Sequence, residues 1–385
     1  MNKVKISAVI AEFNPLHEGH KYILRQARTK AGASHVLVVL SGNFTQRAEP
    51  AILPKHQRAE AAVHAGADAV VEIPTAYATG NAEVFAKAAV QVVNSFPHVT
   101  TLVFGVEKIL GTVEETVALL KKIAVAQVNK KSEFERAIKP HLKQGMSFDH
   151  ARCEVIKKML PAIPANFIEN AMKTPNNILG IEYLKELVRL KSTIKPIGVA
   201  RIKNMSATAI REKMIKRREN VPNYDRFGAM TVFNVRSGVN ENIYNVNQEI
   251  LNLFKNNTPV TYEELKTEVP TRRFSVSRIA RIALHATLGV TKDDVKLLYQ
   301  ADSLPYTNLL AIKSSEGQLF AALCLNEKTP LVVKGNKNKP KNSHYARILQ
   351  KIDAKAELLY QTVCGLEFDN RPVFVAQALL VNKVD

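Results

Sequence analysis

The sequence predicts a doubly wound α/β fold, in which helices cover both faces of a parallel sheet. Short runs of Val, Ile and Leu with little alternation recur along residues 1–215, and amphipathic stretches separate them. A strand that is buried on both faces has a continuous apolar run, and parallel neighbours are joined by helical crossovers. We therefore expect one α/β domain over residues 1–215.

The order of the expected elements follows from these runs. Five are expected as strands: residues 5–13, 35–42, 68–74, 100–107 and 195–202. Three amphipathic segments are expected as helices: residues 20–32, 55–67 and 82–96. A mostly helical insert is expected over about residues 112–170, because apolar residues recur there at helical spacing.

The regular alternation stops near residue 216, and residues 223–230 interrupt it. Residues 233–257 and 272–290 then have helical patterns. We expect residues 216–385 to form a second, mainly helical domain with a few short strands.

The charge and the cysteines limit the class of protein. The 385 residues carry a formal net charge of +19 that is spread along the chain, so nucleic acid is the first partner to consider. A basic surface without a partner is the alternative. Cys153, Cys324 and Cys364 are far apart, which indicates neither a disulfide framework nor a zinc site. The sequence shows no signal peptide and no apolar span of about 18 residues, so a cytoplasmic protein without a membrane partner is expected.

A histidine pair follows the first expected strand. His17 and His20 flank Gly19 where a helix should begin. A helix N-terminus suits phosphate, and each histidine could donate a hydrogen bond to it. Capping or core histidines are the alternative, and a metal site lacks an obvious third ligand.

Three other segments should reach the same edge of the sheet, where ligands of open α/β folds bind. Residues 40–51 are a polar loop, and Gly105 at the end of a strand leaves room for a base or ribose. Ser206 and Thr208 stand before an expected helix, with Arg211 one turn later. Hydroxyls, helix N–H groups and an arginine can together clamp a polyphosphate. Singly, each segment has an ordinary structural explanation as a turn or a capped helix.

Taken together, the H-x-G-H opening and the S-x-T-x-x-R helix start resemble the nucleotidyltransferase superfamily, whose two motifs grip a triphosphate from opposite sides. The resemblance is closer to the bacterial tRNA(Met) cytidine acetate ligase family. It is carried, in order, by EFNPLHEGH, SGNFTQRAEPA, ADAVVEIP, FGVE, TPNNILGIEYL and SATAIR. It covers about residues 5–215 and is looser beyond, where PYTNLLAIK is similar. One departure is Ala48, where the family pattern leads us to expect glycine.

The resemblance implies a two-step reaction. Acetate attacks the α-phosphate of ATP to give acetyl-adenylate and pyrophosphate. The N4 amine of the wobble cytidine of elongator tRNA(Met) then takes the acetyl group, leaving N4-acetylcytidine and AMP. We expect His17, His20 and Arg211 to neutralise phosphate charge during this reaction, because acetate is a weak nucleophile. Mg²⁺ is expected with ATP, and no resident metal site is predicted.

The resemblance also implies ATP contacts along one segment and at three further positions, beside the expected clamp at Ser206 and Thr208. The ATP contacts are Ile10, Ala11, Glu12, Phe13, Asn14, Pro15, Leu16, His17, Glu18, Gly19, His20, Lys21, Tyr22, Ile23, Gly105, Asn176 and Arg201.

With tRNA as the substrate, two basic clusters are candidate phosphate contacts. They are Arg272, Arg273, Arg278 and Arg281, and Lys334, Lys337, Lys339 and Lys341. A solvated helix face and a basic loop are the respective alternatives.

Two other functions stay open. A small-molecule nucleotidyltransferase acting on NMN or phosphopantetheine would share the fold, but would have little need for a basic second domain. A tRNA-binding protein without chemistry is disfavoured by the two intact phosphate motifs.

Overall fold

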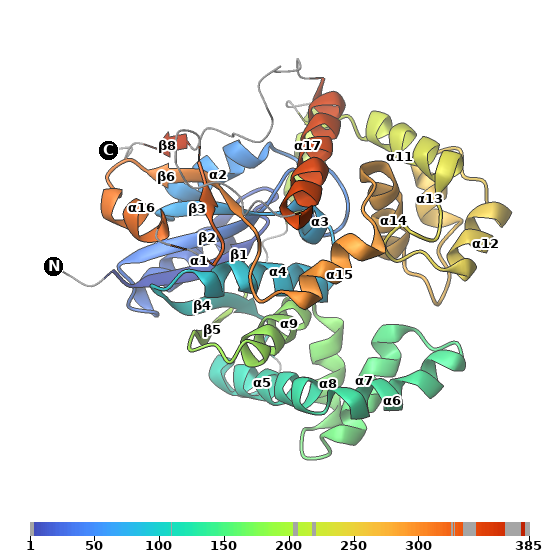
Figure 1. The fold of residues 1–385 in the computed structure, drawn as a ribbon. Helices are drawn as coiled ribbons and strands as arrows, with labels where there is room; N and C mark the ends of the chain where they lie inside the picture. The colour runs from blue at the N-terminus through green and yellow to red at the C-terminus, as the bar shows by residue number, and fades with distance from the viewer. Residues whose placement is uncertain are drawn as a thin grey trace.

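Five neighbouring parallel strands form most of the sheet in the computed structural model, in the order β5–β4–β1–β2–β3 (Figure 1). The structure describes residues 4–108, 110–202, 207–217, 221–324, 326, 328–333, 344–365 and 379–381. These parallel strands are β1 (Ile6–Ala11), β2 (His35–Ser41), β3 (Ala69–Ile73), β4 (Val99–Val106) and β5 (Lys195–Ala200). All five strands predicted from the apolar runs are thereby confirmed.

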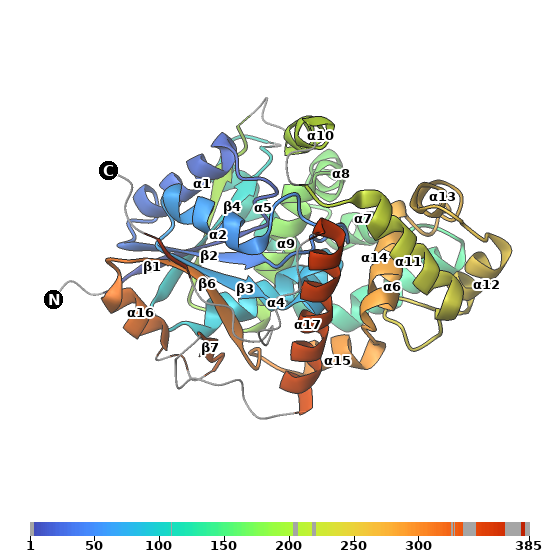
Figure 2. The same ribbon diagram turned by 90° about the horizontal axis from the view of Figure 1, so that it is seen from above.

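Helices cover both faces of this sheet (Figure 2), which confirms the doubly wound arrangement. The covering helices are α1 (Glu18–Thr29), α2 (Lys55–His64), α3 (Thr75–Ala78), α4 (Ala82–Ser95) and α9 (Pro175–Arg189). Leu24 of α1 and Ala59 of α2 pack in one core with Val38 of β2. Val90 of α4 and Leu184 of α9 belong to a second core, with Val39 of β2 pointing to the opposite face.

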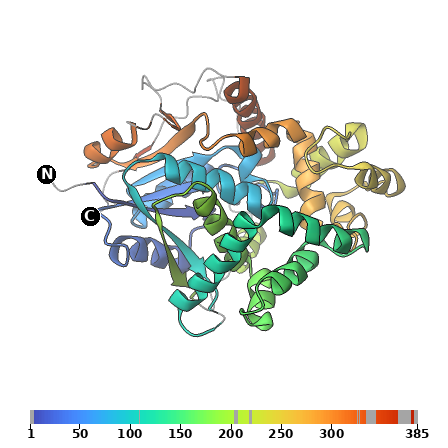
Figure 3. The same cartoon turned by 60° about the horizontal axis from the view of Figure 1, so that its bottom comes forward.

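The expected insert contains four helices, seen below the sheet in Figure 1 and brought forward in Figure 3. They are α5 (Val113–Asn129), α6 (Lys131–Lys143), α7 (Phe148–Met159) and α8 (Ala165–Lys173). Gly198 of β5 allows α5 to approach the sheet closely, because a Cβ there would lie 2.5 Å from Val117. Ile138, Ala151 and Val155 form a small separate core between α6 and α7.

The following part of the chain is mainly helical. Its helices are α10 (Ala207–Arg217), α11 (Tyr224–Gly238), α12 (Gln248–Asn256), α13 (Tyr262–Thr267), α14 (Val276–Leu288), α15 (Lys292–Gln300), α16 (Gly317–Cys324) and α17 (His344–Cys364). Two details differ from expectation. Residues 224–230 are helical, because Asn223 accepts a hydrogen bond from the Arg226 N–H and starts α11. The expected helical segment 233–257 is broken after Gly238 and resumes at Gln248.

Strands from this later part return to the sheet. β6 (Thr307–Lys313) pairs antiparallel with β3, and both β7 (Leu331–Val332) and β8 (Leu379–Val381) pair in parallel with β6. The division of the chain at residue 215 remains a prediction. Strands from beyond it extend the sheet of the first part.

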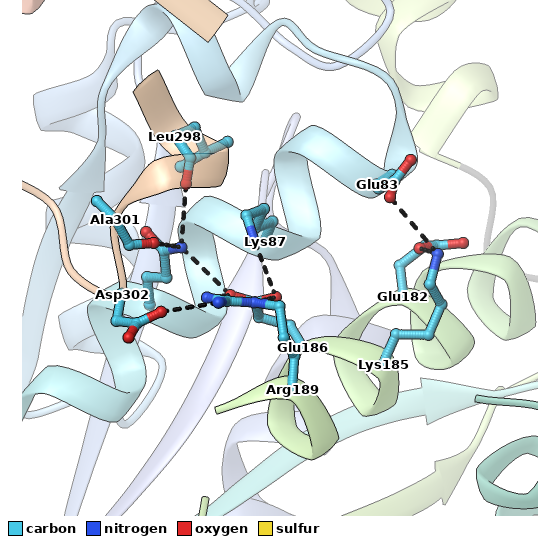
Figure 4. A network of polar contacts seen from close by, with 10 residues as sticks. Glu83, Lys87, Glu182, Lys185, Glu186, Arg189, Leu298, Ala301 and Asp302 are labelled. Carbon is cyan, nitrogen blue, oxygen red and sulfur yellow. Dashed lines mark hydrogen bonds and ion pairs between the residues drawn. The ribbon is translucent and has the colours of Figure 1, made fainter. Parts of the chain in front are cut away.

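A buried polar network fastens α15 to α4 and α9 (Figure 4). The Glu186 carboxylate of α9 lies 3.3 Å from Lys87 Nζ of α4 and accepts hydrogen bonds from Arg189. Arg189 also pairs with Asp302, just beyond α15, at 2.7 Å. The helical part is therefore tied to the helices that cover the sheet.

Candidate active site

The carboxyl ends of β1 and β4 are adjacent in the sheet, and the chain leaves them toward opposite sides. This is the topological switch point where open α/β folds bind ligands. The β1 end leads into His17 and α1, and the β4 end leads into Glu107.

His17 and His20 are fixed by capping the start of α1. The His17 Nδ1 accepts a hydrogen bond from the Gly19 N–H at 3.1 Å, and the His20 Nδ1 accepts one from the His17 N–H at 3.3 Å. Their rings stack with centroids 3.7 Å apart. Because each Nδ1 is an acceptor, each neutral ring carries its proton on Nε2. The capping alternative is therefore correct, and it leaves both Nε2–H groups as donors.

Both rings are held neutral. Burial and the neighbouring His17 lower the pKa of His20 to about 3. Burial, followed by the positive charge of Arg201, lowers the pKa of His17. Neutral Nε2–H donors at a helix N-terminus suit a phosphate ligand.

Arg211 lies beside this helix start. One guanidinium N–H group donates to the Asn14 carbonyl at 2.7 Å, and another donates to Thr208 Oγ1 at 2.9 Å. The sequence had suggested that Thr208 stands before the helix. It lies instead inside the first turn of α10. The expected partner Ser206 lies outside the described residues. The structure thus brings Arg211 and Thr208 to the β1 side of the site.

The segment between β1 and α1 has a sharply bent backbone. Phe13 has a φ of 45°, in the left-handed region, and the Asn14–Pro15 peptide bond is cis. Asn14 Oδ1 accepts a hydrogen bond from the Ile52 N–H at 2.7 Å, which joins this segment to the loop after β2.

The β4 side carries a second polar group. Glu107 Oε1 accepts from Arg201 at 2.9 Å and from Asn176 Nδ2 at 3.4 Å. Asn177 bonds both the N–H and the carbonyl of Glu107, at 3.0 and 2.9 Å. Arg201 directly follows β5, which ends at Ala200. Three expected ATP-contacting positions, Gly105, Asn176 and Arg201, therefore gather at one strand end.

Gly105 faces the space between α1 and α9. A Cβ there would lie 3.6 Å from Ile23 Cδ1 and 3.8 Å from Asn176 Cγ. These are ordinary van der Waals distances, so protein contacts do not require a glycine here. The expected role of Gly105 beside a base or ribose stays a prediction.

The loop after β2 is held by a buried arginine that the sequence analysis missed. Arg58 of α2 is 1% exposed and donates to the backbone carbonyls of Glu12, Gly42 and Leu53. Burial lowers the pKa of Arg58 to about 10. Ala48, in this loop, has a φ of 61°, the region that favours glycine.

Glu107, Asn177 and Arg58 were all missed as site residues. An acidic residue directly after a strand was the available indication for Glu107. Asn177 binds Glu107, and Arg58 binds the Glu12 carbonyl, across long stretches of sequence, and no local pattern marks these contacts.

The arginines expected to contact tRNA differ in exposure. Arg272 and Arg273 are exposed, and Arg273 pairs with Glu249. Arg278 and Arg281 are half-buried, and burial lowers the pKa of each. Arg278 stacks on Phe274 with its guanidinium carbon 4.8 Å from the ring centroid. Lys334, Lys337, Lys339 and Lys341 lie outside the described residues.

Among the described residues, no three His, Cys, Asp or Glu side chains gather so that they could hold a metal ion. No helix in the described part of the chain is long and apolar enough to cross a membrane.

The chain is similar to proteins of one enzyme class. A family model described as HIGH Nucleotidyl Transferase matches residues 4–227 and 210–371, which together cover most of the chain. The chain therefore has the fold of a HIGH nucleotidyltransferase.

Curated relatives then define the particular family. A tRNA(Met) cytidine acetate ligase of Acetivibrio thermocellus is 34% identical over 376 residues, which are 86% of this chain and 88% of that protein. The protein of that name from Caldicellulosiruptor saccharolyticus is 30% identical, over 97% of this chain and 99% of its own. This chain belongs to the tRNA(Met) cytidine acetate ligase family and is an enzyme of the ligase class.

A solved structure supports the fold. The crystal structure of Thermotoga maritima TmcAL bound with alpha-thio ATP aligns with a TM-score of 0.87 and 24% identity, over 98% of this chain and 100% of that one.

Proposed function

We propose that this ligase activates acetate with ATP and transfers the acetyl group to N4 of the wobble cytidine of elongator tRNA(Met). The reaction passes through acetyl-adenylate and releases pyrophosphate and AMP. The observation that carries the proposal is the arrangement at the switch point. Two neutral histidines and Arg211 lie at the start of α1, and the charge of Arg201 acts on His17 from the β4 side.

The β1 side is the proposed triphosphate site. The Nε2–H groups of His17 and His20, the N-terminus of α1 and the Arg211 guanidinium would donate to phosphate oxygens. Such donors stabilise the charge that grows on the phosphates as acetate displaces pyrophosphate. Thr208 supports Arg211 through the hydrogen bond at 2.9 Å, and Ser206 completes the proposed clamp.

The β4 side is the proposed nucleoside site. The space before Gly105 would take the adenine or ribose, with Asn176 and Arg201 at its border. The structure of the TmcAL relative was solved with an ATP analogue, which supports ATP as the ligand. Mg²⁺ would arrive with ATP, held chiefly by phosphates and water.

The proposal includes tRNA binding by the basic surface. The net charge of +19 supports a polyanionic partner. Arg272 and Arg273 are exposed for phosphate contact, and Arg278 and Arg281 lie nearby in the sequence, on α14. We place the enzyme in the cytoplasm, where its tRNA substrate is found.

The test is ATP–pyrophosphate exchange, followed by transfer of labelled acetate to tRNA. We expect exchange that depends on acetate, and label that appears in elongator tRNA(Met) as N4-acetylcytidine. Exchange driven by NMN or phosphopantetheine would contradict the proposal in favour of a small-molecule nucleotidyltransferase. Tight, salt-sensitive tRNA binding without any exchange would contradict it in favour of a binding protein.

A further inference from the structure

The two half-reactions of the proposed function differ in their need for a base. In the first, an acetate oxygen bonds to the α-phosphorus and pyrophosphate leaves with the electron pair. Acetate is already an anion, so no proton has to move. In the second, N4 of cytidine bonds to the acetyl carbon and the C–O bond to AMP breaks. AMP takes that electron pair as a phosphate anion, and N4 loses one proton that needs an acceptor.

The polar groups already described are poorly suited to accept this proton. The pKa of His20 is about 3, and its Nδ1 is occupied by the His17 N–H. His17 is likewise a cap whose Nδ1 accepts from Gly19. Glu107 Oε1 is bound by both Arg201 and Asn176. These groups serve as donors or are tied in ion pairs.

Glu12 differs from Glu107 in its hydrogen-bond donor, which is a backbone N–H and not an arginine. It directly follows β1 at the switch point, and its Oε1 accepts from the Gln46 N–H at 2.6 Å. No described residue donates a hydrogen bond to its other carboxylate oxygen, Oε2. One oxygen therefore fixes the side chain while the other remains available.

The surroundings of Glu12 raise its pKa above the ordinary glutamate value. Burial raises its pKa, and the Gln46 hydrogen bond and three arginines oppose that rise. The charged and titratable groups that act on it come from the loop after β2 and from α2, α9 and α10: Arg47, Arg58, Tyr183 and Arg211. A carboxylate with a raised pKa is a better proton acceptor than an ordinary glutamate.

We propose that Glu12 is the general base of the transfer step, taking the N4 proton through its Oε2 as the acetyl group moves to cytidine. The proton then passes to solvent, which regenerates the carboxylate. This role rests on the proposed function and separates the two half-reactions. Adenylate formation does not need Glu12 as a base, and acetyl transfer does.

The test is Glu12→Gln, whose amide oxygen can still accept from the Gln46 N–H. Synthetic acetyl-adenylate and tRNA supply the second step directly in a single turnover. We expect transfer to slow by about 100-fold or more, since general-base catalysis contributes about 10²–10⁴-fold. Acetate-dependent exchange should fall much less, because Glu12 can lose an ATP contact in that step but does not act there as a base. The matched control is Glu60→Gln, an exposed carboxyl on α2, which should leave both rates unchanged.

Two outcomes would overturn the role of Glu12. One is wild-type transfer by the Gln variant, and the other is an equal loss of exchange and transfer in a variant with unchanged melting. If the variant does not fold, the wild-type rate of transfer from acetyl-adenylate is measured against pH. It should rise through one pKa above the ordinary glutamate value, and a flat profile overturns the proposal. Absence of acetate-dependent exchange in the wild type would instead count against the proposed function itself.

Discussion

At the scale of single residues, the histidine pair performs two tasks with its two nitrogens. The Nδ1 atoms complete the cap of α1, and this fixes the tautomer that leaves each Nε2–H free to donate. Burial keeps the rings uncharged. The pair therefore acts through hydrogen bonds and not through positive charge, and Arg211 supplies the charge.

Replacement of His20 by alanine tests this division. His20→Ala removes one Nε2–H donor, and we expect exchange to fall by about 100-fold or more, as for loss of one charge-stabilising donor. Loss of the capping partner should also cost about 1 kcal/mol of stability. Affinity for tRNA should not change. Because the pKa of His20 is about 3, its charge should not contribute a pH limb to wild-type exchange near neutrality.

His64→Ala, at the exposed end of α2, is the control for His20→Ala and should retain wild-type exchange. Wild-type exchange by His20→Ala itself would exclude the donor role.

At the scale of elements, α9 connects the site to the rest of the molecule. Its N-terminal residues Asn176 and Asn177 contact Glu107, and its Glu186 forms the buried network with α4 and α15. Glu182, one turn before, pairs with Arg152 of α7 at 2.6 Å. The helix therefore places the nucleoside side of the site relative to both the insert and the helical part.

The charge of Glu186 should contribute to stability because its partner Lys87 is buried with it. Lys87 and Glu186 side chains are each 6% exposed. Glu186→Ala leaves the Lys87 ammonium without its partner, and we expect a loss of about 3–5 kcal/mol in the free energy of unfolding. Urea denaturation measures this change. Glu133→Ala breaks an exposed pair with Lys130 and should cost less than about 1 kcal/mol, so equal effects of the two variants would contradict the argument.

Elements and polar contacts were not equally predictable from the sequence. The five parallel strands could be predicted because a strand that is buried on both faces has a continuous apolar run in the sequence. The site's location followed from His17 and Arg211, which belong to short motifs at strand ends. Glu107 and Asn177 are 70 residues apart, and Arg58 binds the carbonyl of Glu12, 46 residues away. Local periodicity carries no information about such contacts, since folding alone brings these groups together.

At the scale of the whole molecule, α17 in the C-terminal part contacts the loop after β2 and the start of α2. α17 contributes Glu357, whose carboxylate lies 3.2 Å from Lys55 Nζ, and Tyr360, which donates to the Ala51 carbonyl at 2.8 Å. Asp353 of α17 accepts from the Thr75 N–H and from the Tyr306 hydroxyl, both at 2.7 Å. Helix α17 thus holds together segments that lie hundreds of residues away from it in the sequence, including the loop after β2.

This attachment should make stability depend on pH through Asp353. Burial and the charge of Glu72 raise its pKa to about 6. The folded protein then binds this proton more tightly than the unfolded chain does. Asp353 therefore contributes most to stability at a pH below the pKa that it has in the unfolded chain. This contribution decreases as the pH rises from about 4 to about 6 and is absent above that range.

Asp353→Asn removes this titration, and the amide oxygen can still accept from the Thr75 N–H. Lys55 also neutralises Glu72 and Glu357, so removing a third carboxylate should relieve repulsion. We expect the variant to be more stable than wild type above about pH 7, by about 1 kcal/mol or more, with a flatter dependence between about pH 4 and 6. Glu357→Gln removes a direct partner of Lys55 and should instead destabilise at neutral pH. Urea unfolding of the three proteins across this range measures both effects, and a destabilised Asp353→Asn at neutral pH would show that the ionised carboxylate holds α17 in place.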